Sequence, residues 1–540
     1  MQNAKLVSVF KDFPFPFTPK NLPDLPITGI SIDSRVVKPG DLFVAMQGGL
    51  VDGHAYIPMA IDAGAVAVVG HKVMHDLPVP YIRVEDPRQS LTFLAAAFYD
   101  WPGRKLTVIG VTGTDGKTTT CNLIYNILVT AGFKAGMIST VNAVLGDEVM
   151  DTGFHVTTPD AHDVQRYLAK MVDAGLTHVV LETTSHGWSQ HRVDACEFDI
   201  GVVTNITHEH FDEHGSYENY RAAKARLFSS LEKTVSKPQG NPRLAIFNQD
   251  DRSFSFLNNL VKVNKITYGL KNDADVQGSN IVYNLEGMQF TVKHSQLRVG
   301  IKVHLVGKYN VSNSLAALCA TVFGLGIEPT VAAMGIANLP GIPGRMEVID
   351  MGQDFTAIVD FAHTPNALKV TLETAREMLD SPLFLGEGSG VRTEGRIIAV
   401  FGSAGLRDKE KRRLMAEISA ELADLTVLTA EDPRTESLDG ILDEMAAGAR
   451  SRGGREGETF WRVPDRGEAI KFALQLALPG DIVLSCGKGH EQSMCFGKVE
   501  FPWDDRTAMH AALADYLDID GPDMPYLPTH EKSEKDWLKL

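Results

Sequence analysis

Residues 105–132 read KLTVIGVTGTDGKTTTCNLIYNILVTAG and contain an apolar strand pattern, a glycine-rich turn and a helical pattern, in that order. In such a turn, glycines let backbone N–H groups close around phosphate oxygens, and the helix N-terminus adds positive partial charge. A lysine then reaches the β- and γ-phosphates, and the hydroxyl after it binds Mg²⁺. We therefore predict an ATP-binding loop with Mg²⁺ on Thr118, made of Gly113, Thr114, Asp115, Gly116, Lys117, Thr118 and Thr119.

The loop departs from the common G-x-x-x-x-G-K-[ST] pattern at its first position. Val111 stands where the first glycine belongs, and Gly110 comes one residue too early, so we expect Gly113 to make the turn. The pattern G-x-G-x-x-G is absent from this loop, which disfavours a nicotinamide dinucleotide fold.

Strand patterns alternate with helical patterns along nearly the whole chain, which is typical of parallel sheets covered by helices. The class is α/β, and 540 residues at about 150 per domain suggest three domains. Trp101-Pro102-Gly103 and LPGIPGR (Leu339–Arg345) are turn-rich and mark two boundaries. We expect an N-terminal domain at 1–104, a central P-loop ATPase-like domain with a parallel or mixed sheet at 105–343, a C-terminal Rossmann-like domain at 344–516 and a tail at 517–540. A Gly/Ser-rich insertion between Ser381 and Gly395 is predicted to be a flexible loop.

Composition and charge exclude several classes of protein. The net charge is −16, with acids and bases interspersed, so no basic face is available for nucleic acid. No apolar run approaches the roughly 18 residues of a membrane span, and the first residues lack a secretory signal, so we expect a cytoplasmic protein without membrane insertion. The five cysteines form no C-x-x-C pair and are expected to be reduced thiols.

A carboxylate and several histidines follow two strand patterns of the central region. The strand THVVLE ends in Glu182, at the sheet edge where the phosphate loop also belongs, which makes Glu182 a candidate Mg²⁺ ligand. The next strand leads into NITHEHFDEHG, which carries His208, His210 and His214. Zinc would need a cysteine partner or an H-E-x-x-H helix, so Mg²⁺ with one imidazole fits better.

Lys224 lies on the helical pattern ENYRAAKARLF, just past the histidines. An ammonium has no lone pair for a metal and repels Mg²⁺, so two readings are open. Either Lys224 is a surface salt-bridge partner, or CO₂ has converted it to a carbamate. Side-chain chemistry alone favours the surface partner.

These segments together resemble the Mur ligases, and most closely the members that add the third amino acid to the peptidoglycan peptide. The resemblance extends from about Ile30 to Leu513 and rests on eleven motifs in order. They are DSRVVKPGDLFVA, GVTGTDGKTTT, HVTTPD, LETTSHGWSQHRV, NITHEHFDEHGSYENYRAAKARLF, GKYNVSNSLAA, GRMEV, DFAHTPNAL, FGSAGLRDKEKR, EDPRTE and GKGHE. It implies a UDP-sugar domain, an ATP-binding ligase domain and an amino-acid-binding domain. It also implies an ATP-dependent amide ligase that adds a diamino acid to UDP-N-acetylmuramoyl-L-alanyl-D-glutamate through an acyl phosphate.

The resemblance implies roles residue by residue. Lys117, Glu182, His210 and Lys224 would form the catalytic set, with two Mg²⁺ ions on Thr118, Glu182, His210 and a Lys224 carbamylated by CO₂ (N6-carboxylysine). Asn310 and Asn313 would face adenine, and Arg345 with Asp360 would lie on the ATP side. The muramoyl peptide and its UDP group would contact Ser34, Thr157, Thr158, Ser185, Gln190 and Arg192.

The segment EDPR (Glu431–Arg434) occupies the place of the DNPR motif of relatives that add meso-diaminopimelate, where the arginine pairs with the distal carboxylate. The implied amino-acid pocket consists of Arg407, Glu431, Asp432, Pro433, Arg434, Gly487 and Glu491. Glu431 and Asp432 add a negative charge beside this carboxylate, so L-lysine and L-ornithine stay open beside meso-diaminopimelate. Lys488 and His490 are expected to be pocket walls.

Two other kinds of function remain open. Another ligase of the superfamily would share the phosphate loop but not DSR together with EDPR and GKGHE. A nucleotide-dependent regulator would not need a second metal ion. The presence of Glu182, His210 and Lys224 as ligands for such an ion argues against that function. We expect the chain to act as a monomer.

Overall fold

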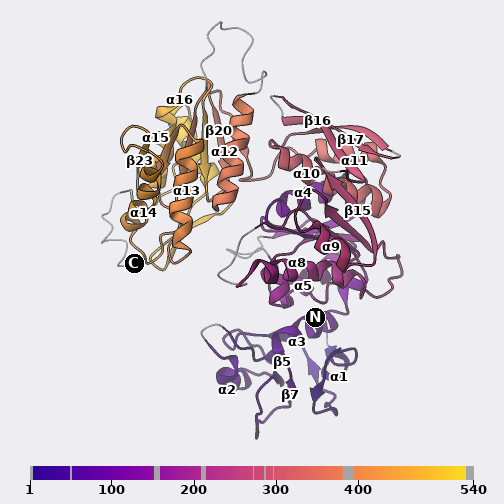
Figure 1. Ribbon diagram of the computed structural model, residues 1–540. Coiled ribbons are helices and arrows are strands. Elements are labelled where there is room, and N and C mark those ends of the chain that lie inside the picture. The colour runs from indigo at the N-terminus through magenta and orange to yellow at the C-terminus, as the bar shows by residue number, and fades with distance from the viewer. Residues whose placement is uncertain are drawn as a thin grey trace. The chain divides into compact units, whose positions relative to one another are not determined.

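The structure is a computed structural model that describes residues 4–48, 51–150, 158–207, 215–271, 273–284, 287–295, 297–380 and 395–530 (Figure 1). The chain forms two compact units. The first contains residues 1–279, 292–299 and 311–338, and the second contains residues 280–291, 300–310 and 339–540. No helix within the described ranges is both long and apolar enough to cross a bilayer. Helices and mostly parallel sheets alternate along the chain, which confirms the α/β class.

The N-terminal part of the first unit is built on a five-stranded sheet. Its order is β2 (Phe17–Thr18), β7 (Tyr81–Val84), β6 (Ala67–Gly70), β5 (Asp41–Val44) and β4 (Gly29–Ser31). All neighbours are parallel except β2 against β7. The associated helices are α1 (Leu6–Val9), α2 (Ile57–Asp62) and α3 (Pro87–Phe98). The α3 helix begins after Asp86, whose carboxylate caps the N–H groups of Arg88 and Gln89.

An eleven-stranded sheet follows, with parallel strands at its centre. Its order is β11 (Val149–Met150), β10 (Ala143–Val144), β9 (Ala135–Ile138), β12 (His178–Glu182), β8 (Thr107–Thr112), β13 (Ile200–Val203), β14 (Leu244–Asn248), β15 (Asn264–Gly269), β16 (Val276–Asn284), β17 (Gly287–His294) and β18 (Leu297–Val303). The strands from β9 to β15 are parallel, and every residue of β8 is buried. This burial on both faces explains the continuous apolar runs of these strands.

The helices of this region are amphipathic or fully covered. They are α4 (Lys117–Thr130), α5 (Ala161–Asp173), α6 (Ser185–Ser189), α8 (Tyr217–Leu231), α9 (Phe254–Leu260), α10 (Lys308–Leu318) and α11 (Pro329–Ala337). The α4 helix begins at Lys117, four residues before the apolar pattern that predicted it. The reason is Gly116, whose φ of 78° ends the loop and starts the helix immediately.

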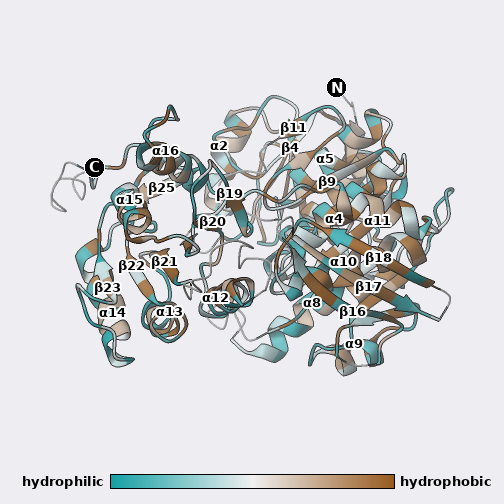
Figure 2. Cartoon of the chain, turned by 90° about the horizontal axis from the view of Figure 1, so that it is seen from above, coloured by the Kyte–Doolittle hydropathy of each residue, from teal (hydrophilic) through white to brown (hydrophobic). Residues whose placement is uncertain are grey.

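The second unit contains a six-stranded sheet between two layers of helices. Its order is β19 (Glu347–Ile349), β20 (Thr356–Asp360), β24 (Ile482–Cys486), β21 (Ile397–Phe401), β22 (Leu425–Leu428) and β23 (Phe460–Arg462). One layer has α12 (Pro365–Leu379), α13 (Lys409–Leu422) and α14 (Leu438–Ser451); the other has α15 (Arg466–Leu476) and α16 (Asp505–Leu517). Figure 2 shows the apolar strands β21 and β22 between these layers. A small hairpin of β25 (Ser493–Phe496) and β26 (Val499–Pro502) precedes α16.

Two ion pairs are buried in the interior. In the first unit the Lys237 ammonium contacts the Asp199 carboxylate and donates to the carbonyl of Leu106, 2.9 Å away. In the second unit the Arg466 guanidinium binds both carboxylate oxygens of Asp505 at 2.7 and 2.5 Å. Burial alone would raise the pKa of Asp505, but Arg466, together with the Trp503 indole N–H, lowers it below the usual value. Both pairs are fully hydrogen-bonded, which burial of charge requires.

The residues after α16 form neither helix nor strand as far as His530, in agreement with their lack of periodicity. They nevertheless pack on the second unit. Leu527 is buried in its core, and the Thr529 hydroxyl donates to the Asp465 carboxylate at the start of α15 at 2.7 Å. This part of the tail is therefore folded, although its sequence carries no secondary-structure signal.

We expect the Asp505→Ala substitution to lower the free energy of unfolding of the second unit by about 3 to 5 kcal/mol, because it leaves the Arg466 charge buried without a partner. Asp443→Ala is the control, since Asp443 is an exposed partner of Arg462 and such pairs contribute about 0 to 1 kcal/mol. Urea unfolding followed by tryptophan fluorescence measures both. Equal losses in the two variants would contradict a stabilising role for the buried pair.

Candidate functional site

The central strands bring three loops to one sheet edge. Strand β8 lies between β12 and β13 and is parallel to both, with Glu182 opposite Val111 and Val203 opposite Thr112. Segments that leave parallel strands at their carboxyl ends lie together at one edge. The loop after β8, which carries Lys117, therefore lies beside Glu182 and the residues after Val203.

Two glycines allow the loop after β8 to fold closely. Gly113 has a φ of 155° and Gly116 a φ of 78°, conformations that side chains disfavour. A Cβ atom on Gly113 would collide with the Thr204 hydroxyl, and one on Gly116 would collide with the amide of Asn313. Gly113 makes the turn, as the sequence predicted, because no side chain fits between it and Thr204.

Hydrogen bonds from the loop after β13 hold the phosphate loop in place. The Asn205 backbone carbonyl accepts from Thr114 N at 2.7 Å, and its side-chain oxygen accepts from Asp115 N at 3.0 Å. The Thr114 and Tyr220 hydroxyls are 3.1 Å apart. The Lys117 ammonium donates to the Thr114 carbonyl at 2.7 Å, which holds the lysine over its own loop. The loop is therefore ordered by the protein itself.

The Glu182 carboxylate lies against the start of α4. Glu182 is 1% exposed. Its two carboxylate oxygens accept from the Thr118 hydroxyl at 3.1 and 3.0 Å, and one of them also accepts from Thr140 N at 2.9 Å. Carboxylate and hydroxyl oxygens are the donors that Mg²⁺ prefers, so the pair fits that ion. Across the described part of the chain, no three His, Cys, Asp or Glu side chains gather as a metal site. His210, the predicted imidazole ligand, lies outside the described residues.

Lys224 is buried on α8, with 2% of its surface exposed. Its ammonium donates to the Gly113 carbonyl at 2.5 Å and lies 4.5 Å from the centre of the Tyr220 ring. The sequence-based preference for a surface salt bridge is therefore wrong. The preference failed because Lys224 is buried against a backbone carbonyl and an aromatic ring, a placement that no charge pattern along the chain reveals.

The predicted muramoyl-peptide residues form a cluster that reaches Glu182. The Arg192 guanidinium donates to the Thr158 carbonyl at 2.6 Å and to the Gln190 side chain at 2.7 Å. The Thr158 hydroxyl donates to the Glu182 backbone carbonyl at 3.2 Å, and Ser185 is buried at the start of α6. Thr157 lies outside the described residues. Ser34 is buried in the N-terminal part, with its hydroxyl 3.3 Å from the Met59 sulfur.

The remaining predicted ATP residues lie mostly in the second unit. The Arg345 guanidinium lies 4.4 Å from the centre of the Phe361 ring. The Asp360 carboxylate accepts from Met346 N at 2.7 Å and Ala362 N at 2.9 Å, so it holds the segment that carries Arg345. Asn310 donates from its side chain to the Val306 carbonyl at 2.8 Å. Arg345 and Asp360 are therefore close in the structure, because the Asp360 carboxylate binds the backbone of Met346, the residue after Arg345.

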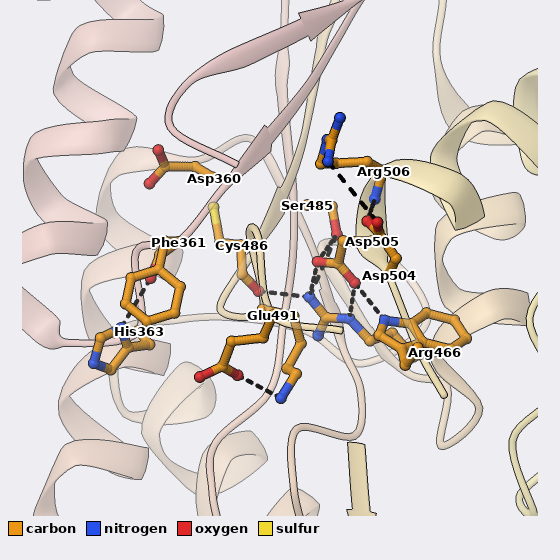
Figure 3. A network of polar contacts seen from close by, with 12 residues as sticks. Asp360, Phe361, His363, Arg466, Ser485, Cys486, Glu491, Asp504, Asp505 and Arg506 are labelled. Carbon is orange, nitrogen blue, oxygen red and sulfur yellow. Dashed lines mark hydrogen bonds and ion pairs between the residues drawn. The ribbon is translucent and has the colours of Figure 1, made fainter. Parts of the chain in front are cut away.

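A second group of loops meets at the carboxyl edge of the six-stranded sheet. Buried Lys488 lies 3.2 Å from both Asp432 carboxylate oxygens and 2.5 Å from Glu491, and the latter pair is drawn in Figure 3. Cys495 N also donates to Asp432 at 2.8 Å. The negative charge of Asp432 is therefore matched by a cation and a backbone donor.

Buried polar atoms with no hydrogen-bond partner among the described residues gather at this same edge. They belong to Ser403, Glu431, His490 and Ser493. Burial raises the pKa of Glu431 to about 7, and burial with nearby cations lowers that of His490 to about 3. Other such atoms occur elsewhere in the described chain, for example in Thr120 and Arg192. The four at this edge lie on or just beyond the loops after three neighbouring strands, where a bound ligand would supply their missing partners. His490 is uncharged at neutral pH and fits its expected role as a pocket wall.

Arginines flank this edge on two loops. The Arg434 guanidinium is partly exposed and makes no hydrogen bond or ion pair within the described chain, while the backbone N of Arg434 donates to Cys495 at 3.0 Å. Arg407 is exposed on the loop after β21. Glu436 holds that loop through Leu406 N at 2.8 Å and is itself paired with buried Arg412. Pro433 and Gly487 complete the predicted set. A Cβ atom on Gly405 would collide with the Pro433 carbonyl, and a Cβ atom on Gly487 would collide with the Glu431 carboxylate.

The sequence did not single out three residues of the first site. Asn205 and Tyr220 lie within the quoted motifs but are not predicted as site residues. The signal for Asn205 is a polar side chain just after a strand, and the signal for Tyr220 is a hydroxyl on a buried helix face. Thr140 contributes only a backbone N–H to Glu182, which any residue could donate. No sequence signal could have found it.

Comparisons with known proteins agree along the chain. Residues 26–99 match the Mur ligase family catalytic domain, 111–321 the Mur ligase middle domain, and 344–489 the glutamate ligase domain of Mur ligases. The chain is 42% identical over 498 residues to a UDP-N-acetylmuramyl-tripeptide synthetase of Roseiflexus sp. (strain RS-1), covering 91% of this chain and 95% of the relative.

Two further relatives are similar over most of their length. A UDP-N-acetylmuramoyl-L-alanyl-D-glutamate–2,6-diaminopimelate ligase of Geobacillus thermodenitrificans (strain NG80-2) is 38% identical over 487 residues, 90% of this chain and 95% of the relative. A solved structure of a 2,6-diaminopimelate ligase of the same description has a TM-score of 0.64 and 29% identity, and covers 95% of this chain and 99% of its own. Sequence and fold therefore point to the same family.

The packing around Gly116 predicts that Gly116→Ala weakens ATP binding at least about tenfold, because the new Cβ meets Asn313 and disfavours the turn that shapes the loop. Gly132→Ala is a matched control. Gly132 has a φ of 81° against 78° for Gly116, but a Cβ there meets nothing within 4 Å. Calorimetric titration with ATP compares the two. Equal affinities of the two variants for ATP would contradict a role for the close packing at Gly116.

Proposed function

The chain belongs to the Mur ligase family, and on that premise we propose that it is an ATP-dependent ligase of peptidoglycan precursor synthesis. It adds a diamino acid, with meso-diaminopimelate the best candidate, to UDP-N-acetylmuramoyl-L-alanyl-D-glutamate and releases ADP and phosphate. The observation that carries this proposal is the bond between Thr118 and Glu182 at a glycine-shaped phosphate loop. A folded phosphate loop with a carboxylate at its metal position suits phosphoryl transfer.

The reaction needs two steps on the substrates. The D-glutamyl carboxylate attacks the γ-phosphorus in line, a new O–P bond forms, and ADP leaves. The α-amine of the diamino acid then attacks the acyl phosphate carbon, phosphate leaves, and the amine loses a proton to solvent. Lys117 neutralises charge on the transferred group, and Arg192 with Thr158 orients the muramoyl peptide. No protein nucleophile is required.

Two Mg²⁺ ions are part of this proposal, held by Thr118, Glu182, His210 and a carbamylated Lys224. They would supply positive charge that lets two anions approach each other. The carbamate forms when the uncharged Lys224 amine attacks CO₂, a C–N bond forms and one proton is released. Its two oxygens are suitable Mg²⁺ donors, whereas an ammonium is not. The burial of Lys224 against the Gly113 carbonyl supports this reading, since it places the amine at the phosphate loop.

The acidic neighbours of Arg434 do not exclude a distal carboxylate. Asp432 is paired with Lys488, and Glu431, with a pKa of about 7, is largely uncharged in mildly acidic solution. The extra charge counted in the sequence is thus offset or absent near the pocket. This favours meso-diaminopimelate. L-Lysine and L-ornithine stay as alternatives, because above a pH of about 7 Glu431 would be ionised and would repel a distal carboxylate, which they lack.

In this proposal each of the three domains binds one substrate. Ser34 contacts the UDP group in an N-terminal domain at 1–104, ATP binds at 105–343, and the amino acid binds at 344–516. The enzyme works as a monomer in the cytoplasm, where ATP and nucleotide-linked sugars are made.

We expect ATP-dependent phosphate release only when UDP-muramoyl-L-Ala-D-Glu and an amine are both present. Meso-diaminopimelate should give a higher kcat/KM than L-lysine or L-ornithine at pH 6.5, because a bidentate arginine–carboxylate pair is available only to it. A coupled phosphate assay with each amine at equal concentration measures this. Release without any amine would indicate a simple ATPase, and silence with all three amines would overturn the proposed function.

Arg434→Ala tests the pocket in the same assay. Loss of a charged hydrogen-bonded pair should raise KM for meso-diaminopimelate at least about tenfold, with little change in KM for ATP. The control is Arg455→Ala, an arginine paired with Glu458 on the surface. Equal changes in both KM values would remove Arg434 from the amino-acid pocket.

Lys224→Ala should abolish turnover, and added formate or acetate should partly restore it, because a small carboxylate can replace the carbamate oxygens in the space left. Lys224→Arg should stay inactive at every formate concentration, since arginine forms no carbamate and leaves no space. The assay is phosphate release against formate concentration. Full activity of Lys224→Ala without added carboxylate would show that no carbamate is needed.

A further inference from the structure

Glu431 is a buried acid without a hydrogen-bond partner for one of its oxygens. It follows strand β22, is 5% exposed, and its Oε2 atom has no partner within the described chain. Gly487 packs so closely that a Cβ there would collide with Oε2, and Gly402 packs on the Glu431 Cβ atom in the same way. The carboxyl group is therefore held between the loops that follow β21 and β24, with Oε2 at the edge where the other unpartnered atoms gather.

Two of the cations near Glu431 are engaged with other acids. Lys488 is shared between Asp432 and Glu491, and Arg466 is paired with Asp505. Figure 3 shows the Arg466–Asp505 and Glu491 pairs beside Ser485 and Cys486. On α13, the partly exposed Lys411 is the cation that lowers the pKa of Glu431 most, while Asp432 raises it. The buried Cys486 thiol is also close enough to interact with it.

Glu431 makes no direct ion pair within the described chain, and its Oε2 atom has no hydrogen-bond partner there. Burial is the largest influence and raises the pKa of Glu431 to about 7, against partial opposition from Lys411, Arg466 and Lys488. A group whose neutral form is favoured by burial ionises as the pH rises through that value. Both charge states of Glu431 are thus accessible near neutral pH, in the loop that also carries Arg434.

We propose that Glu431 is a specificity-determining residue that makes the choice of incoming amino acid depend on pH. The inference rests on the proposed function, in which this loop binds the distal end of the diamino acid. When uncharged, Glu431 donates its O–H proton in a hydrogen bond to a distal carboxylate beside Arg434. When ionised, it repels that carboxylate, which L-lysine and L-ornithine lack, whereas it attracts the distal ammonium that all three amino acids carry.

The test is the ratio of kcat/KM for L-lysine to that for meso-diaminopimelate, measured from pH 6 to pH 8.5. Deprotonation of the attacking α-amine affects both substrates alike and cancels in the ratio. In the unaltered enzyme the ratio should rise about tenfold or more, which corresponds to about one pKa unit of interaction energy. In Glu431→Gln it should change less than about twofold, because the amide keeps the shape and cannot ionise. Glu458→Gln, an exposed acid, should follow the unaltered enzyme.

Each outcome decides the question. A flat ratio in the unaltered enzyme, or the same rise in Glu431→Gln, would overturn the role of Glu431 while the ligase activity stands. Turnover with neither amine would overturn the proposed function, and this inference with it. Infrared difference spectra give a readout independent of turnover. A protonated carboxyl band that disappears near pH 7 is expected in the unaltered chain and not in Glu431→Gln, which distinguishes Glu431 from Asp199 and Asp360, whose pKa values burial also raises. Absence of the band from the unaltered chain, or its presence in both, would contradict the proposal.

Discussion

The parallel pairing of β8 with β12 and β13 is the constraint on which the first site depends. Glu182 lies opposite Val111 because of that register, and only there can its carboxylate accept from Thr118 and Thr140. A shift of one residue would turn every side chain of β12 to the other face of the sheet. The same pairing brings Asn205 under the phosphate loop, where it accepts from two successive backbone donors. The chemistry of the loop is thus set by strand register.

The two candidate sites differ in how their polar groups are satisfied. At the phosphate loop, Lys117, Thr118 and Glu182 have partners within the protein, so the loop keeps its shape, although the buried hydroxyls of Thr120 and Thr207 have none within the described chain. At the edge of the six-stranded sheet, Ser403, Glu431 and Ser493 each retain an unpartnered buried atom. A nucleotide with many phosphate oxygens can be bound by a preformed loop. An amino acid with few polar atoms is selected better by buried polar groups that have no hydrogen-bond partner until it binds. A wrong ligand leaves these groups without partners and therefore binds less tightly.

The sequence predicted what depends on local pattern and missed what depends on distant contacts. The phosphate loop, the strand ending in Glu182 and the α/β class follow from short segments, since turn residues and apolar runs act locally. Lys224 was misplaced because Gly113, its partner, is 111 positions away. A count of formal charges takes Glu431 as fully ionised, whereas burial raises its pKa to about 7, which no local pattern reveals. The folded part of the tail near Leu527 could not be foreseen, since a single buried side chain has no periodicity. His210 and the 381–394 insertion lie outside the described residues.

A chain of net charge −16 whose proposed substrates are all anionic or zwitterionic must bind them by local fields. At the phosphate loop the field comes from the N-terminus of α4, which begins directly at Lys117 and adds backbone donors to the lysine charge. At the second site it comes from Arg434, whose guanidinium no acid of the described chain engages, while Lys488 absorbs the charge of Asp432. The acidic surface therefore weakens non-specific binding of anions, whereas each site places cations where the anionic groups of a substrate would bind. A few cations placed beside acids that already have partners within the protein therefore allow an acidic chain to bind anionic groups at specific positions.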